Sequence, residues 1–484
     1  MKGAKSFLLL AFVLLALNRC AHGSQKYTVG WVRGLNARIR RSKGVKGATT
    51  AMPCRLSKII ASIIGASTLI GGPAIVHASK FDPRPPPVQS RRPYFIGYFI
   101  RATDYESNGS FCVIIGSFCG AGVSENSYNS HYVSVSYLDD CGKLCTVDAF
   151  PPKEKVSITS HGIPMADAPT PDGKSDPCFC WESEGLGRLE VGPSGGQFRF
   201  KFPEVELLAR YTGRLPWSLE RPNSAGPEGW LAKTGLLPTH YFVHSFNSDV
   251  WYQLSVQDRN PCHGRGSLHM ESNYGDVFPE GWIWSQGCSA SIGKEGALCG
   301  AIADRDRSQA TMNQGDKHMG QAHYVFTGGK FVIGPIVTNT WLIGYRSDKI
   351  QWDFRTTDGD SIQRSCVSYD DGHVSLVATS RDGSRIMEVE VKAPKASFGE
   401  PIYVPSISGW TNEPGCVESH TATATFRCYS KRLGRGKGIV HLIEEVVMPL
   451  AILEFGGDMY SSVTRGRSHG GATGVSPLST RTNS

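Results

Sequence analysis

The side chains best suited to chemistry gather in one short stretch, residues 268–288. Two acids, two indoles and two amides lie within sixteen residues there: Glu271, Asn273, Asp276, Trp282, Trp284 and Gln286. On an extended strand Trp282, Trp284 and Gln286 would share one face, because alternate side chains point the same way. If that face lines a barrel lumen, two aromatic rings and an amide would meet whatever the lumen holds. The ordinary alternative is that tryptophans on a strand belong to a packed core.

Outside this stretch the sequence carries no familiar catalytic pattern. It has no glycine-rich dinucleotide or phosphate loop, no His-Glu-x-x-His and no Gly-x-Ser-x-Gly elbow. Residues 192–196 read as a turn rather than a nucleophile. The pairs Cys141/Cys145 and Cys178/Cys180 lack Cys-x-x-Cys spacing, which disfavours zinc. We therefore expect no cofactor, no metal site and no hydrolase triad.

Strands must position these side chains, because the hydrophobic pattern from residue 93 onward alternates with a period of two. The clearest runs are 94–101, 111–118, 131–138, 197–202, 252–257, 282–286, 322–327, 374–380, 421–429 and 439–445. Helical periodicity is weak, and 204–211 is the best short candidate. So many strands predict a mostly β fold of two antiparallel barrel or sandwich units packed together, residues 93–255 and 256–460, with few short helices.

The positive charge of the chain belongs to its leader. The sequence has 484 residues, with 51 Lys and Arg against 43 Asp and Glu, a net charge of +8. Residues 1–79 hold twelve basic residues and no acid, which leaves 39 basic against 43 acidic residues in the rest. A mildly acidic body argues against a nucleic-acid partner, because phosphate contacts need clustered cations.

The leader predicts a targeting route in several steps. Residues 1–23 have the layout of a secretory signal peptide, and 24–79 combine transit-peptide composition with a second apolar run, 59–76. A proline-rich linker follows at 80–92, and the tail 461–484 reads as disordered. This order favours a plastid reached through the secretory pathway, with a thylakoid-associated or lumenal destination. The alternative is a secreted or endomembrane protein in which the second run is retained as an anchor.

The central stretch resembles the signature of the tocopherol cyclase family, in which Glu-Lys-Asn-Trp-Gly precedes Phe-Pro and then Trp-x-Trp-x-Gln. The matching positions are Glu271, Asn273, Gly275, Phe278, Pro279, Trp282, Trp284 and Gln286, with Tyr274 where the family has a tryptophan. Less specific blocks agree in order: Phe95–Arg101, Gly229-Trp230, Pro238–Tyr241, and Gly434–Lys437 with Ile439–Glu445 and Glu454–Gly457. The resemblance spans residues 93–458.

The chain departs from the family pattern at its opening block. Ile96 stands in place of the family's Glu, and Tyr98 in place of a Trp. Thr239 separates Pro238 from His240, where the family has the two adjacent. If the opening Glu is catalytic in the family, this chain would be a relative that does not close a ring.

The resemblance implies a pair of lipocalin-like β-barrels and a ring closure in tocopherol (vitamin E) biosynthesis. The substrate would be a hydroquinone with a phytyl or related prenyl chain. A proton adds to the alkene nearest the ring, and the phenol oxygen captures the tertiary cation to form a chromanol. This reaction needs no redox cofactor.

The chemistry requires a carboxylic acid kept protonated by apolar surroundings or a cationic histidine, aromatic faces beside the cation, and an acceptor for the phenol proton. With the resemblance, we expect Glu271 as the acid, Asp276 as the second candidate, and His240 as the proton acceptor. The expected substrate contacts are Trp282 and Trp284 on the cation, Asn273 and Gln286 on the phenol, and Tyr274 and Trp230. The plainer alternatives are turn carboxylates for both acids and a strand cap for His240.

Two other functions remain open on the sequence. One is a carrier without chemistry for a prenylquinone, carotenoid or other lipid, since such a barrel needs the same apolar interior. The other is related chemistry on a similar fold, such as carotenoid hydration or a pericyclic ring closure. In each case the expected partner is an apolar small molecule, with peripheral contact to a membrane or plastoglobule, and no protein partner is implied.

Overall fold

The chain folds into strands over most of the residues that its structure describes. This computed structural model describes residues 94–119, 130–160, 179–192, 195–217, 226–233, 237, 239–275, 278–289, 321–333, 336–405, 409–410, 414–432 and 439–461. The predictions for the leader, the linker and the tail beyond residue 461 lie outside the described residues. Among the described helices, none has the length and apolar character needed to cross a bilayer.

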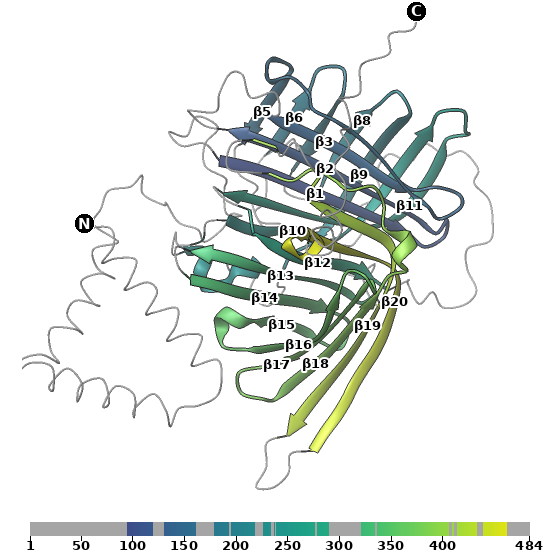
Figure 1. Ribbon diagram of the computed structural model, residues 1–484. Coiled ribbons are helices and arrows are strands. Elements are labelled where there is room, and N and C mark those ends of the chain that lie inside the picture. Colours follow the sequence, from purple (N-terminus) through teal and green to yellow (C-terminus); the bar gives the residue numbers. More distant parts are fainter. Residues whose placement is uncertain are drawn as a thin grey trace, which may run out of the picture. The chain divides into compact units, whose positions relative to one another are not determined.

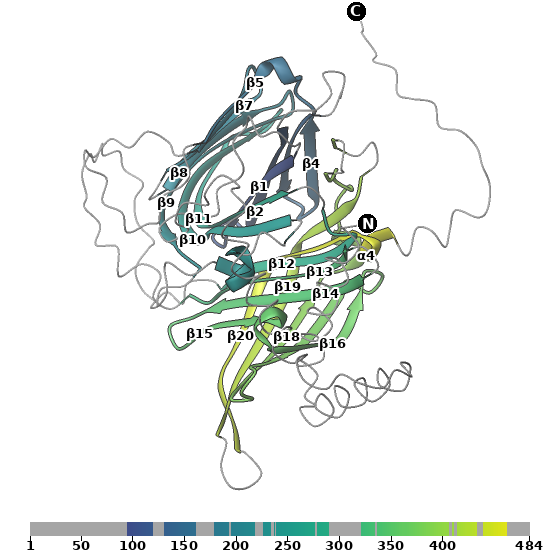
Figure 2. The same ribbon diagram turned by 90° about the vertical axis from the view of Figure 1, so that its left-hand side faces the viewer.

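The first sheet has eleven antiparallel strands (Figures 1 and 2). They are β1 (Tyr94–Asp104), β2 (Gly109–Cys119), β3 (His131–Leu138), β4 (Leu144–Ala149), β5 (Val156–Ser160), β6 (Phe179–Ser183), β7 (Gly187–Val191), β8 (Gly195–Lys201), β9 (Val205–Leu215), β10 (Thr239–Val256) and β11 (Cys262–Gly275). Their order is β4-β3-β2-β1-β11-β10-β9-β8-β7-β6-β5. The first strand therefore pairs with the last, and the two edge strands follow each other in the chain, as in a curled up-and-down sheet.

The second sheet has nine strands, and again its first strand pairs with its last. They are β12 (Gly281–Cys288), β13 (His323–Ile333), β14 (Ile336–Arg346), β15 (Gln351–Arg355), β16 (Ser361–Ser368), β17 (His373–Thr379), β18 (Arg385–Lys392), β19 (Cys416–Arg432) and β20 (Ile439–Gly457). Their order is β15-β14-β13-β12-β20-β19-β18-β17-β16. The predicted fold class, mostly β with two antiparallel barrel units, is confirmed.

Helices in the described part of the chain are short. They are η1 (Lys153–Lys155), η2 (Gly226–Lys233), η3 (Thr356–Asp358), η4 (Lys395–Ser397) and α4 (Asp458–Ser461). The helical candidate 204–211 is wrong, because this run lies in β9. Val205, Leu207, Ala209 and Tyr211 are buried there while Leu208 and Arg210 are exposed, which is the period of a strand.

The chain changes from the first sheet to the second between Gly275 and Gly281, later than the division after residue 255 that the pattern predicted. The reason is that the first sheet needs β11. Its residues pair with β1 on one side, from Gly275 opposite Phe95 to Ser267 opposite Thr103, and with β10 on the other. A sequence pattern does not reveal which strand closes a sheet on its first one.

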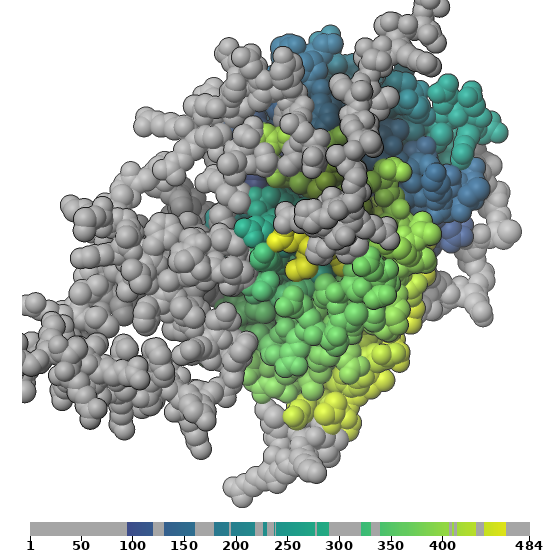
Figure 3. Space-filling view, in the orientation of Figure 1, coloured from purple at the N-terminus to yellow at the C-terminus, as the bar shows by residue number. Residues whose placement is uncertain are grey.

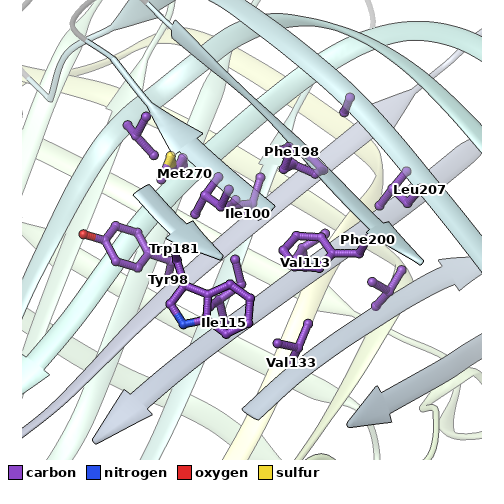
Figure 4. Close-up of a cluster of buried hydrophobic side chains, with 14 of the residues drawn as sticks. Tyr98, Ile100, Val113, Ile115, Val133, Trp181, Phe198, Phe200, Leu207 and Met270 are labelled. Carbon is purple, nitrogen blue, oxygen red and sulfur yellow. The ribbon is translucent and has the colours of Figure 1, made fainter. Parts of the chain in front are cut away.

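The concave faces of both sheets carry packed apolar cores. In the first, side chains from β1, β2, β3, β6, β8, β9 and β11 interdigitate, with Trp181, Phe198 and Phe200 among the largest (Figure 4). In the second, Tyr324, Phe426 and Tyr345 stack with ring centroids 4.4 and 5.2 Å apart along the series. Residues 82–484 form one compact unit that contains both sheets.

The two sheets also bury side chains against each other. Strands β1, β11 and β12 are buried on both faces over much of their length, unlike the half-exposed β9. A third apolar cluster combines residues of both sheets, including Phe99 and Val243 from the first and Trp282, Trp284 and Ile452 from the second. The outward faces of these strands therefore meet in a shared layer.

Two glycines that face this layer differ in the space around them. Gly97 on β1 and Gly116 on β2 are directly opposite in the antiparallel ladder. A Cβ atom at Gly116 would lie 1.8 Å from Cζ2 of the buried Trp410 ring, whereas one at Gly97 would have its nearest neighbours, two carbonyl oxygens, at 3.9 Å. We expect Gly116→Ala to lower the free energy of unfolding by about 1–3 kcal/mol and Gly97→Ala to change it by less than about 0.5 kcal/mol.

Urea unfolding of residues 82–484, followed by tryptophan fluorescence, measures both variants. Equal losses in the two variants would mean that the approach of Trp410 to β2 is not as described.

Candidate functional site

Two rows of side chains face each other between the sheets. In the first sheet Glu271 on β11 lies in register between Phe99 on β1 and Val243 on β10. It is 3% exposed. This row therefore places one carboxyl group in an apolar strip that faces the second sheet.

The second row carries two more acids. Glu454 on β20 is opposite Glu418 on β19 and also opposite Trp284 on β12. Glu418 is 3% and Glu454 is 8% exposed. Cross-strand neighbours on one face lie within contact of each other, so the ladder itself brings these three side chains together.

The side chains of Trp282, Trp284 and Gln286 share one face of β12, but the expectation that this face lines a barrel lumen is wrong. Trp282 and Trp284 belong to the layer between the sheets, while Ile283 belongs to the core of the second unit. The physical reason is that β12 is buried on both faces, so alternation alone could not tell the inner face from the outer one.

Glu271 accepts hydrogen bonds at a single oxygen. Tyr241 Oη donates to Glu271 Oε2 at 2.6 Å, and Trp284 Nε1 donates to the same oxygen at 3.1 Å, across from the other sheet. His269 Nε2 lies 2.9 Å from Oε2, and His269 Nδ1 lies 3.3 Å from the carbonyl oxygen of Phe246. Because a carbonyl can only accept, Nδ1 carries a proton, and one further proton is held between Nε2 and Oε2.

Glu418 and Glu454 form the opposite kind of site, one that holds protons. Burial raises the pKa of Glu418 to about 7. Burial and then the charge of Glu418 raise the pKa of Glu454 well above its usual range. Trp282 Nε1 donates a hydrogen bond to Glu454 Oε1. Near neutral pH this pair therefore keeps at least one carboxyl group in its acid form.

A buried cation stands beside the acids. Arg101 on β1 is 1% exposed, and its guanidinium donates to Gln286 Oε1 at 2.8 Å and to the carbonyl oxygen of Leu450. Its charge acts to lower the pKa of Glu418, against the larger effect of burial. Gln286, expected to orient the phenol, thus holds Arg101.

His420 connects the acid pair to the first sheet. Its Nε2 lies 3.3 Å from Glu418 Oε2 and its Nδ1 lies 3.1 Å from Ser110 Oγ. Burial and the charge of Arg101 hold the pKa of His420 well below its usual value, so the ring is neutral near pH 7.

Aromatic rings line the acids. Phe99 contacts Trp284 edge-on with centroids 4.6 Å apart, and Phe278 contacts Trp282 in the same way at 4.8 Å. Gly456 allows this arrangement, because a Cβ atom there would lie 2.0 Å from the Trp282 ring. The arrangement supplies proton donors, a proton acceptor and π faces within one apolar layer. No group of His, Cys, Asp and Glu side chains within the described ranges is arranged to hold a metal ion.

The other predicted residues fall in different places. His240 and Tyr274 stack with centroids 4.8 Å apart and face the core of the first unit, and His240 Nδ1 lies 3.0 Å from Glu228 Oε2. This places His240 on the opposite face of β10 from Tyr241, away from Glu271. Asn273 is half-buried on the same face of β11 as Glu271. Asp276 and the side chain of Trp230 lie outside the described residues.

Sequence reasoning missed Arg101, His269, Glu418, His420 and Glu454 as site residues. A usable signal existed in the two alternating pairs His269-x-Glu271 and Glu418-x-His420, each a polar couple on one face of an otherwise apolar strand. Charged groups inside such strands are rare unless they are paired.

Comparison with known proteins adds little to this description. No family model and no curated protein matches the chain. Among solved structures, the chain is similar to a Nitrosomonas europaea protein provisionally described as AttH, with 11% identity over 76% of this chain and 92% of that chain, and a TM-score of 0.39. A likeness of this extent carries no argument about function.

The raised pKa of Glu418 predicts how stability depends on pH. The usual value is 4.5 and the folded value is about 7, so the unfolded chain loses this proton first as the pH rises. The free energy of unfolding should therefore fall between pH 4.5 and pH 7, by at most about 3 kcal/mol for this group. Glu418→Gln should remove that part of the pH dependence.

Denaturant midpoints measured from pH 4.5 to 8 test this expectation. Glu182→Gln, at a side chain that is 48% exposed, is the control and should keep the wild-type slope. An unchanged slope in Glu418→Gln would show that the carboxyl group is not held in its acid form.

Proposed function

We propose that this chain is a tocopherol cyclase-like acid–base catalyst that closes the chromanol ring of a phytyl or related prenyl hydroquinone. The observation that carries the proposal is the contrast between the buried carboxyl groups: Glu271 Oε2 accepts hydrogen bonds from Tyr241 and Trp284 and shares a proton with His269, whereas Glu418 and Glu454 are buried together with raised pKa values. A carboxyl group held in its acid form can give a proton, and a carboxyl group beside a histidine and two hydrogen-bond donors can receive one, so the two kinds of site suit one acid–base reaction. The resemblance of residues 268–288 supplies the substrate class.

In this proposal Glu454 is the proton donor. Its carboxyl proton adds to the alkene nearest the ring, at the carbon whose protonation leaves a tertiary cation on the other alkene carbon. The electron pair of the broken O–H bond stays on the Glu454 carboxylate. The indoles of Trp282 and Trp284 flank the acid and stabilise the cation through their π faces. Glu418 replaces the proton that Glu454 gives up, since the two are cross-strand neighbours.

Glu271 is the proton acceptor, in place of the acid role expected from its sequence position. Its Oε2 is occupied by Tyr241, Trp284 and His269, so Oε1 is the oxygen that takes the phenol proton while the phenol oxygen bonds to the cation. One proton is given and one is received, so the product is an isomer of the substrate and no oxidant or reductant is needed.

The departure at Ile96 does not remove an acid from this layer. Ile96 belongs to the core of the first unit, on the opposite face of β1 from Phe99 and Arg101. The isoleucine at position 96 is therefore no reason to prefer a carrier over an enzyme for this chain.

The leader supports a location for this chemistry as a further proposal. Its signal-like and transit-like segments favour a plastid, where an apolar hydroquinone would reach the enzyme from a membrane or plastoglobule surface.

Incubating residues 82–484 with a phytyl hydroquinone in D₂O tests the proposed function. We expect a chromanol that carries one deuterium on the carbon that was protonated, detected by mass spectrometry. Glu454→Gln and Glu271→Gln should each lower the turnover rate by about 100-fold or more, because each removes one acid–base step. Glu182→Gln, at an exposed acid, should leave the rate unchanged.

The outcomes separate the rival functions. Saturable binding of the hydroquinone without product would select the carrier, and product at the wild-type rate from Glu454→Gln would place the acid elsewhere. An alcohol in place of the chromanol would indicate that water, rather than the phenol, captures the cation.

A further inference from the structure

One long strand has an edge that the described part of the chain leaves unpaired. β20 pairs with β19 from Ile439 to Gly456, but it pairs with β12 only from Ile452 to Gly457. The hairpin of β19 and β20 extends past its neighbours in both ribbon views (Figures 1 and 2). Within the described ranges, residues 439–448 therefore have no strand along their second edge.

The edge of β20 has hydrogen-bond partners at Pro449 and Leu450, next to residues 439–448. Tyr105 Oη donates to the carbonyl oxygen of Pro449 at 3.1 Å, and Arg101 donates to the carbonyl oxygen of Leu450. Residues 439–448 contain no proline and no lysine, the two residue types that proteins commonly use to protect a free edge. Backbone donors and acceptors along a strand edge that has no partner strand bind another strand readily.

Exposed apolar side chains gather on the same ten residues. Of the five large hydrophobic side chains that are exposed in the described ranges, three lie here: Val440 at 49%, Leu442 at 53% and Val447 at 54%. Residues coloured yellow-green to yellow, which include β19 and β20, lie at the lower end of the coloured part of the space-filling view (Figure 3). Among the residues that the structure describes, this edge thus combines backbone groups that have no partner strand with an apolar outer face.

A bulge makes the placement of the outer-face residues of this segment symmetric. Cys428 is opposite Glu444 and Tyr429 is opposite Leu442, so Ile443 is the extra residue. Val440, Leu442, Glu445 and Val447 lie on one face of β20, because their partners on β19 are every second residue: Lys431, Tyr429, Arg427 and Thr425. These four side chains are exposed, as is His441, while Glu444 is buried. The four outer-face positions are therefore placed symmetrically about a centre between Ile443 and Glu444.

This symmetry is what an antiparallel pair of identical strands requires, because opposed residues must lie on the same face. Pairing about that centre puts Val440 opposite Val447 of a second copy, and Leu442 opposite Glu445. The centre brings Glu444 and Glu445 of both copies close together. Glu445 is already paired with Arg427 at 2.9 Å, and Glu444 is buried and accepts a hydrogen bond from Ser347, so repulsion between the copies is small. A hydrocarbon surface is a poor occupant by comparison, because it cannot pair free backbone groups.

We propose that residues 439–448 of β20 pair antiparallel with the same residues of a second copy of this chain to form a two-fold dimer. The contact joins the two second sheets edge to edge and covers the valines at 440 and 447. It lies at the far end of β20 from Glu454, so it does not depend on the proposed chemistry.

Light scattering coupled to size-exclusion chromatography of residues 82–484 tests the dimer. We expect a mass that rises from monomer to dimer with concentration. Leu442→Lys should raise the dissociation constant at least tenfold, because it places a charge on the edge. Leu208→Lys is the matched control, since Leu208 is 46% exposed on β9, which is paired on both sides, and it should leave the dimer unchanged.

Cross-linking tests the register itself. A mixture of Val440→Cys and Val447→Cys proteins should form a disulfide-linked dimer under mild oxidation, and neither variant alone should do so beyond the wild-type background. The wild type must be included because Cys141 and Cys262 are exposed. A monomer at all concentrations, a dimer that Leu442→Lys does not weaken, or equal cross-linking of the single variants would overturn the proposal.

Discussion

The hydrogen bond from Trp284 Nε1 to Glu271 Oε2 is the contact on which the site depends, because it joins a side chain of one sheet to an acid of the other. Each sheet by itself presents only part of the chemistry. Removing one partner from a buried hydrogen bond costs more than the bond contributes, because the other partner is left buried with neither a protein partner nor water. The packing of the two sheets against each other and the hydrogen bonding of Glu271 therefore depend on each other.

Burying three carboxyl groups in one apolar layer is possible only because they are not all charged. Isolated charges in such a place would cost many kcal/mol, and the chain avoids this in two ways. Glu271 is surrounded by donors, and the pair of Glu418 and Glu454 holds protons, with Arg101 as the buried cation beside them. The arrangement costs stability, since apolar residues of similar volume would fill the layer at lower cost.

The sequence predicted the strands and the shared face of Trp282 and Trp284, because alternation depends only on local geometry. It could not predict which side of that face is the interior, since β12 is buried on both sides. Nor could it predict that Glu454, far away along the chain, would lie opposite Trp284. That neighbour is set by the pairing of the first strand of a sheet with its last, which no local pattern encodes.

The closing block Glu454–Gly457 shows how a weak motif gains meaning from the structure. Glu454 points into the layer and bonds to Trp282, and Gly456 leaves room for the Trp282 ring, which a side chain at that position would meet at 2.0 Å. Gly457 has a φ of 54° and packs against the carbonyl oxygen of Glu280, a position that only glycine occupies without strain. Glu454 thus supplies the acid, Gly456 leaves room for the Trp282 ring beside it, and Gly457 ends the strand. Together the three residues place the Glu454 carboxyl group against the Trp282 indole.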